Sequence, residues 1–222
     1  MMRIIGALLA VAVPALLTDP TPRFVLPGDV GAHVGKPVIV CGVGAGPAQA
    51  GDGRVTFTIG AYESHRPGSA LASIASRIGD DAGRFVGRNV CATGIARMDG
   101  GRPYVEVASI DHVVDDPLMQ GVALARGDVL SPRPLRRGQP RVTGDQIRRV
   151  HGRAEIGIQV VVLPNGVPGP LRVVRSTAPE MEAETLEAVK RWEFAPALRA
   201  GAPVPCLFYV EVTFSSGGRK QD

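Results

Sequence analysis

The stretch AEIGIQVVVLPNG, residues 154–166, has the pattern of one strand that runs into a tight turn. Its apolar residues alternate with other residues from Ile156 to Val162, which is the period of a strand with one buried face. The Pro-Asn-Gly sequence that follows is a turn signal. The next apolar stretch, PLRVVRS at residues 170–176, can return beside the first strand. The sequence therefore predicts an antiparallel hairpin here.

The residues after the hairpin predict a helix and a last strand. TAPE, residues 177–180, matches a capping box in which Thr177 caps the helix and Glu180 reaches back. Leu186, Val189 and Trp192 then recur at helical spacing. Residues 204–214 alternate again as a strand. The order strand, strand, helix, strand predicts a small α+β domain.

Residues 132–214 resemble the TonB C-terminal domain. The resemblance is carried by the strand ending in PNG, the LRVVRS return, the helix end AVKRWEFAPA, the GAPVP turn and the upstream PRPLRRGQP. It implies a small sheet with a helix packed on it. Members of this family recognise an extended segment of an outer-membrane receptor by adding it as a strand at the sheet edge.

The resemblance gives that role to the last strand of this chain. The implied partner-strand residues are Pro205, Leu207, Tyr209, Glu211 and Thr213. Pro205 fits an edge strand because proline cannot donate a hydrogen bond to a ladder. For Leu207 and Tyr209 the alternative is that their side chains pack under the linker.

Gln139 and Pro140 are candidate docking residues at the start of this domain. The family often has Gln-Pro-x-Tyr-Pro there, whereas this chain has Gln-Pro-Arg-Val-Thr. A full energy transducer also needs a membrane anchor and a long Pro-rich spacer. This chain has an export signal and a second folded module in that place. The full transducer role is therefore expected only if the signal stays uncleaved.

The chain begins like an exported protein, with a signal peptide predicted over residues 1–19. Arg3 precedes an apolar core at residues 4–17, and a bilayer span needs about 17 to 25 apolar residues. The expected location is the periplasm, and the alternative is an inner-membrane anchor with the chain facing the periplasm. The three cysteines of the sequence then predict one bridge and one leftover thiol.

The N-terminal half reads as short strands separated by turns, with one helix among them. The expected strands lie at residues 37–41, 54–59, 89–96 and 103–110. Between the second and third, Leu71, Ile74 and Ile78 have helical spacing. The glycines of PVIVCGVGAGP, residues 37–47, do not form a dinucleotide loop, because Pro47 stands where the third glycine belongs. They are instead typical of a strand exit where the chain bends.

Residues 32–114 resemble an OB-fold family of exported bacterial proteins, through HVGKPVIVCG and FVGRNVCATGIARMDGGRPYVEVASIDHV. The resemblance implies a five-stranded barrel domain over residues 28–114, in which the first and fourth strands are neighbours. Those strands carry Cys41 and Cys91, so the resemblance implies a disulfide between them.

An OB barrel offers a ligand face, for which the candidates are Arg54, Phe57, Tyr62 and Arg84. Bases would stack on the aromatic rings over a basic groove. Only two aromatic residues are available and no basic run interleaves them, so nucleic acid is not the favoured ligand. Protein or glycan is the more natural partner of an exported barrel.

Residues 115–131 form the expected linker, and charge gathers from there onward. Residues 126–153 hold eight Arg and two Asp, a net charge of +6 within a chain of net charge +4. Such a run is usually a solvated linker or face. The functional alternative is weak contact with an anionic membrane surface.

The sequence contains none of the common catalytic motifs, so no enzyme, catalytic residue, cofactor or metal site is expected. The predicted fold is mixed and β-rich, an OB barrel plus a TonB-like α+β domain, with a disordered tail at residues 215–222. The predicted function is an exported adaptor that recognises an envelope protein by strand addition, linked to TonB-dependent transport, and it is compatible with a homodimer. The alternative is an OB-fold protein that binds glycan or nucleic acid, with the TonB-like domain as a structural accessory.

Overall fold

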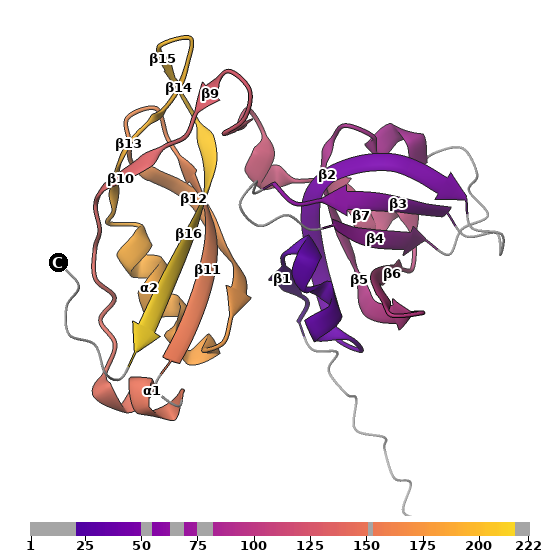
Figure 1. The fold of residues 1–222 in the computed structure, drawn as a ribbon, viewed down its shortest axis with the longest axis horizontal. Coiled ribbons are helices and arrows are strands. Elements are labelled where there is room, and N and C mark those ends of the chain that lie inside the picture. Colours follow the sequence, from indigo (N-terminus) through magenta and orange to yellow (C-terminus); the bar gives the residue numbers. More distant parts are fainter. Residues whose placement is uncertain (1–20, 50–54, 63–68, 75–81, 151–152, 216–222) are drawn as a thin grey trace, which may run out of the picture.

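A computed structural model describes residues 21–49, 55–62, 69–74, 82–150 and 153–215, which form two β-rich modules (Figure 1). The N-terminal module contains the strands β1 to β7 and the C-terminal module contains two α-helices and the later strands. Short 3-10 helices connect the strands: η1 (Pro27–His33), η2 (Ala82–Phe85), η3 (Ile110–His112), η4 (Pro117–Met119) and η5 (Pro179–Met181). Among the described residues no helix is long and apolar enough to cross a membrane.

Five strands of the N-terminal module close into a ring. They are β2 (Pro37–Gln49), β3 (Val55–Gly60), β4 (Ser69–Ile74), β6 (Arg102–Val107) and β5 (Asn89–Asp99). They pair in that order, and β5 pairs back with β2. The β4–β6 pairing is parallel and the other ring pairings are antiparallel. Two short strands extend the ring, β1 (Arg23–Val25) beside β2 and β7 (Val113–Asp115) beside β5.

The ring encloses an apolar core because its strands alternate inward and outward side chains. In β3 buried and half-buried positions alternate along the whole strand. Phe57 and Ile59 of this strand are 1% and 0% exposed. The four expected strands of this half are present, but the first continues to Gln49 instead of ending at residue 41, and the last ends at Val107 instead of residue 110.

The glycines of the PVIVCGVGAGP stretch allow close backbone packing within one long strand, β2. A Cβ at Gly42 would lie 2.1 Å from the Gly60 carbonyl oxygen, and one at Gly44 would lie 2.2 Å from the Phe85 carbonyl oxygen. Any side chain at either position would collide with neighbouring backbone. The stretch is not a phosphate loop, as its sequence predicts, but the prediction that its glycines mark a strand exit is wrong, because all three lie within β2.

The helix predicted around Leu71 and Ile74 is wrong at these two residues, because they belong to strand β4. The strand is paired on both sides, with β3 and with β6, and Ala72 is fully buried. A short run of small apolar residues fits either period, and here the ladder bonds of two neighbours decide the outcome. Ile78 lies outside the described residues.

The C-terminal module is a four-stranded sheet with a helix on it. Its strands are β12 (Pro168–Ser176), β11 (Arg153–Val162), β16 (Cys206–Ser215) and β8 (Ala123–Leu124), paired in that order. The helix α2 (Glu182–Val189) packs over β11 and β12, and its Val189 lies in the same apolar core as Ile156 and Ile158 (Figure 1). The predicted hairpin, helix and last strand are confirmed in this order.

Five short strands extend beyond one end of this sheet. They are β9 (Val129–Leu130), β10 (Arg133–Arg136), β13 (Glu193–Ala195), β14 (Ala197–Arg199) and β15 (Ala202–Val204). β10 pairs with β13, while β14 pairs with both β15 and β9. Residues 115–131 therefore contain the end of β7, η4, β8 and β9, and of these β8 and β9 pair with strands of the C-terminal module.

The predicted capping box is wrong. The Thr177 hydroxyl accepts a hydrogen bond from the Glu155 backbone N–H at 2.9 Å, so it joins β11 instead of capping a helix. A capping box forms elsewhere, where Thr143 caps α1 (Gly144–Arg149) and Gln146 reaches back. This helix is not evident from the sequence, because it lies within the Arg- and Pro-rich segment.

Candidate functional site

One edge of β16 is open along most of its length. On one side β16 pairs with β11 over ten residues without a break, from the Arg153–Ser215 partners to the Val162–Cys206 partners. On the other side only β8 pairs with it, in parallel, opposite Cys206 and Leu207. Within the part of the chain that the structure describes, no strand pairs with this edge at residues 208–215.

The direction of the backbone groups on this edge follows from a single hydrogen bond. The Ala123 N–H donates to the Pro205 carbonyl at 2.9 Å, so the backbone of residue 205 points toward β8. Along a strand the N–H and C=O groups of successive residues alternate between the two sides. Tyr209, Glu211 and Thr213 therefore direct their N–H and C=O groups toward the open side. The structure places all five predicted partner-strand residues along this edge, and β8 covers its beginning.

The side chains along the edge differ in exposure. Glu211 and Thr213 are exposed, whereas Leu207 and Tyr209 are only 6% and 8% exposed. Leu207 packs in an apolar cluster with residues of the N-terminal module, and Tyr209 packs with Leu26. The two buried side chains therefore belong to the junction between the modules, and of these two residues only Tyr209 lies beyond β8 on the open edge.

A buried charge pair stands at the centre of that junction. Arg172 of β12 donates from Nη1 to Asp116 Oδ1 at 2.9 Å and from Nη2 to Asp116 Oδ2 at 2.7 Å. The two side chains are 9% and 0% exposed. The Tyr62 hydroxyl donates to Asp116 Oδ2 at 3.0 Å, and Arg172 Nε donates to Gln159 Oε1 at 2.8 Å. These partners satisfy charges that would otherwise be costly to bury.

Further contacts hold the modules together around this pair. The Arg172 guanidinium lies 5.0 Å from the centre of the Phe24 ring of β1. At the rim, Arg23 Nη2 donates to Glu182 Oε1 at 2.6 Å. The N-terminal module thus covers the face of the C-terminal sheet opposite α2 around Leu207 and Tyr209, while Glu211 and Thr213 of the same strand stay exposed.

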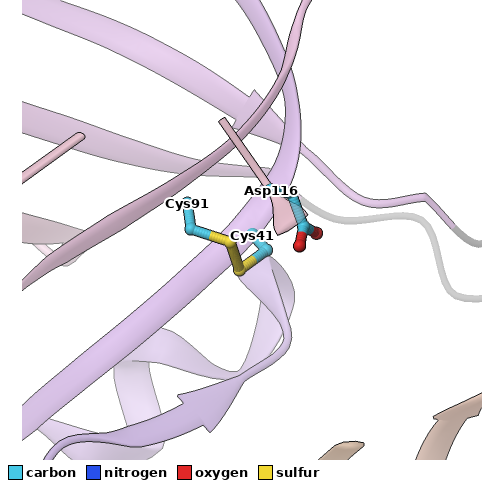
Figure 2. A group of neighbouring side chains, drawn as sticks. All are labelled: Cys41, Cys91 and Asp116. Carbon is cyan, nitrogen blue, oxygen red and sulfur yellow. A yellow bond between two sulfur atoms is a disulfide. The ribbon is translucent and has the colours of Figure 1, made fainter. Parts of the chain in front are cut away.

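Cys41 and Cys91 form a disulfide, as the barrel resemblance implied. They are directly opposite each other on β2 and β5. Figure 2 shows the Asp116 carboxylate beside this bridge, and Arg172 Nη1 lies 3.9 Å from Cys91 Sγ. The ligand atoms of these two cysteines and Asp116 lie within 4.8 Å of one another. The sulfur atoms are bonded to each other and the carboxylate is bonded to Arg172, so the cluster serves the fold.

The third cysteine, Cys206, is free and fully buried at the start of β16. Burial raises the pKa of its thiol to about 11. A thiol with so high a pKa is a poor nucleophile at neutral pH. Cys206 therefore behaves as a small apolar residue in this structure.

The candidate barrel ligand face is not brought together among the described residues. Phe57 lies in the apolar core of the N-terminal module and stacks on Phe85 at 5.4 Å between ring centres, so it is not available to stack on a ligand. Tyr62 is bound to Asp116 at the junction. Arg84 is exposed above the Phe85 ring, and Arg54 lies outside the described residues.

The segment at the start of the C-terminal domain is tied to the end of α2. The Gly138 carbonyl accepts a hydrogen bond from Trp192 Nε1 at 2.9 Å, and the Gln139 carbonyl accepts one from Arg191 at 3.5 Å. Gln139 is exposed and Pro140 is half-buried. These candidate docking residues lie beside the helix end and are not part of the β16 ladder.

Sequence reasoning misses the junction. Asp116 lies in turn-like sequence, and it does accept the Leu118 N–H at 3.0 Å. Its partner Arg172 is 56 residues away in the sequence. Tyr62 could have pointed to a buried acceptor such as Asp116, because it is a hydroxyl donor next to apolar sequence. The OB-fold resemblance instead made Tyr62 a candidate for the ligand face.

Comparison with known proteins finds matches to the C-terminal module. Residues 146–216 match the family described as Gram-negative bacterial TonB protein C-terminal. The C-terminal module matches the TonB C-terminal domain. No curated protein matches the chain. Among solved structures, the solution NMR structure of the Pseudomonas aeruginosa TonB CTD is 19% identical, with a TM-score of 0.29, and the match covers 45% of this chain and 95% of that one.

Proposed function

We propose that this protein is a non-catalytic envelope adaptor whose TonB-type domain binds an extended segment of a partner protein as an added strand on β16. The observation that carries the proposal is the open edge of β16 at residues 208–215, in a module that matches the TonB C-terminal domain. Strand addition gives affinity through main-chain hydrogen bonds and specificity through alternate side chains. An outer-membrane receptor segment is the partner that this family type favours.

The geometry defines what such a partner would meet. The outward backbone groups belong to Tyr209, Glu211 and Thr213, while β8 occupies the edge beside Cys206 and Leu207. A partner strand that pairs only beyond Leu207 leaves β8 in place. A strand that continues to Pro205 must displace β8, which pairs with β16 at only two positions.

We also propose that the N-terminal module is an OB-type barrel. Its support is the ring order β2-β3-β4-β6-β5 with closure of β5 on β2, together with the parallel β4–β6 pairing. A closed ring offers no free edge of its own to a partner strand. In this proposal the barrel covers one face of the TonB-type sheet and fixes where the β16 edge points.

The TonB-type domain and the bridge between Cys41 and Cys91 support a location in an oxidising compartment of the cell envelope. The periplasm is the location we propose. The export signal expected at residues 1–19 lies outside the described residues. Coupling to TonB-dependent transport is the physiological role that this location and domain type favour.

The test is an NMR titration of the full chain with peptides of the extended outer-membrane receptor type. Binding is expected to shift the amide signals of Tyr209, Glu211 and Thr213 more than those of β12. Thr213→Pro removes one outward N–H and is expected to weaken binding about tenfold, whereas Thr213→Val keeps it. If the β16 amides do not shift while the protein is folded, the proposal is wrong.

A further inference from the structure

The small sheet at the end of the C-terminal module presents an exposed apolar row. Leu198 of β14 has Leu130 of β9 as its partner on one side and Pro203 of β15 on the other. Directly opposite residues on antiparallel strands place their side chains on the same face. Leu130 is 67% exposed, the highest value among the large hydrophobic residues that the structure describes. Leu198 is half-buried and Pro203 is exposed, so the row faces outward.

A second exposed leucine lies just along the chain. Leu135 of β10 is 60% exposed, the next highest value within the described residues. The β10–β13 register shifts between Pro134 and Arg136, so Leu135 has no ladder partner. The two most exposed large apolar side chains among the described residues thus occur five residues apart. Neither contributes to the core of the folded chain, so an external contact is the natural reason for an apolar residue at each position.

The same segment concentrates positive charge. Arg126 and Arg133 flank Leu130, both lie at the surface, and the described residues offer neither an ion-pair partner. Arg136 pairs with Glu193, and Arg137 lies over the Trp192 ring. Residues 126–153 carry a net charge of +6, which leaves the rest of the chain at about −2. The apolar row is therefore set in the basic part of a chain that is otherwise slightly acidic.

We infer that this end of the C-terminal module docks on an anionic lipid surface, with Leu130 and Leu135 entering the interface and the arginines binding phosphate head groups. Apolar side chains beside arginines are the combination that interfacial binding requires. Each basic residue near an anionic leaflet strengthens the attraction, and salt screens it. A protein partner is less well matched, since it would have to supply both an apolar contact and several phosphate-like charges.

Figure 1 shows β9, β14 and β15 at the end of the C-terminal module away from α1. The open β16 edge begins near this end, because Val204 of β15 is followed within two residues by Cys206 of β16. Docking would hold the edge close to a membrane, where a membrane protein could present its extended segment. The lipid contact itself does not depend on the proposed strand addition.

The experiment measures co-sedimentation of the full chain with vesicles of phosphatidylethanolamine and phosphatidylglycerol, and with neutral phosphatidylcholine vesicles. Binding to the anionic vesicles is expected to be stronger and to fall as salt is added. Leu130→Ser with Leu135→Ser, and separately Arg126→Gln with Arg133→Gln, are each expected to weaken it on the order of tenfold. Met98→Ser with Val114→Ser is the matched control on the other module, since both residues are also exposed.

A site-specific measurement separates this surface from any other membrane contact of the chain. An environment-sensitive dye on Ser131→Cys is expected to shift to the blue on anionic vesicles, while the same dye on Ala108→Cys, an exposed position of the N-terminal module, is not. Equal vesicle binding by all variants, or no shift at position 131, would overturn the inference. A blue shift at position 131 that grows with protein concentration in the absence of vesicles would also overturn the inference. The apolar row would then be a contact between two copies of the chain.

Discussion

The two modules solve the problem of strand edges in opposite ways. The N-terminal strands close into a ring in which β5 returns to β2, and the disulfide between Cys41 and Cys91 joins these two strands. The C-terminal sheet stays open, because β8 covers only the beginning of β16. Closure removes the unpaired backbone groups that attract other strands, and an open edge keeps them available. In the proposed function, the closed ring supplies stability and the open edge supplies the site of strand pairing.

The largest expected effect comes from the buried charge pair at the junction between the two modules. Arg172→Met would leave the buried Asp116 carboxylate without its cation, at a cost of about 3 to 5 kcal/mol in the free energy of unfolding. Urea unfolding of the full chain measures this loss. The double variant Asp116→Leu with Arg172→Met is expected to recover much of it, since a buried pair can be replaced by apolar residues. A single variant as stable as the parent would show that the junction opens in solution.

The disulfide gives the next largest effect. Cys41→Ala with Cys91→Ala is expected to lower the free energy of unfolding by about 2 to 4 kcal/mol, because the bridge closes a loop with a sequence separation of 50 residues. Thermal unfolding followed by circular dichroism measures the change. The N-terminal module is expected to unfold at a lower temperature than the C-terminal module. The fluorescence of Trp192 reports the unfolding of the C-terminal module separately. Simultaneous unfolding of both signals at the lower temperature would mean that the modules melt as one unit.

The N-terminal and C-terminal modules also show how much of the structure can be predicted from the sequence. The alternation from Ile156 to Val162 determines β11, because a period of two has only one structural meaning at that length. Cys41 and Cys91 could be paired once their strands were taken as barrel neighbours. The Asp116–Arg172 pair could not be predicted, because both residues are in ordinary turn or strand sequence and meet only when the modules pack. β8 is two residues long, which is too short for any periodicity to reveal.

The extent of the open edge can be tested by locking β8 in place. Ala123 and Cys206 are partners across β8 and β16, so Ala123→Cys places a second thiol opposite the native one. After oxidation, a long partner peptide that reaches Pro205 is expected to bind about tenfold more weakly, while a short peptide that stops at Tyr209 is unaffected. The same variant before oxidation, with the bridge between Cys41 and Cys91 intact, is the control. Equal affinity of the long peptide for both forms would mean that β8 does not need to move.

The smallest expected effect is the pH dependence that Cys206 adds to stability. Burial raises the pKa of the Cys206 thiol in the folded chain to about 11. The pKa of a cysteine in an unfolded chain is about 8.5. Between these two values the unfolded state loses its proton first, so the free energy of unfolding falls as the pH rises. Below about pH 8 both states hold the proton and this contribution is complete.

Cys206→Ala removes the titrating group, so the difference in urea midpoint between parent and variant is expected to narrow from pH 8 to pH 10. Cys206→Ser serves as a second comparison, because it keeps the size of the side chain and does not titrate in this range. The cysteine sits where β8 meets β16, at the one place where the open sheet is partly closed among the described residues. A pH dependence that is the same with and without the thiol would show that solvent reaches this position, and that β8 is already away from the edge in solution.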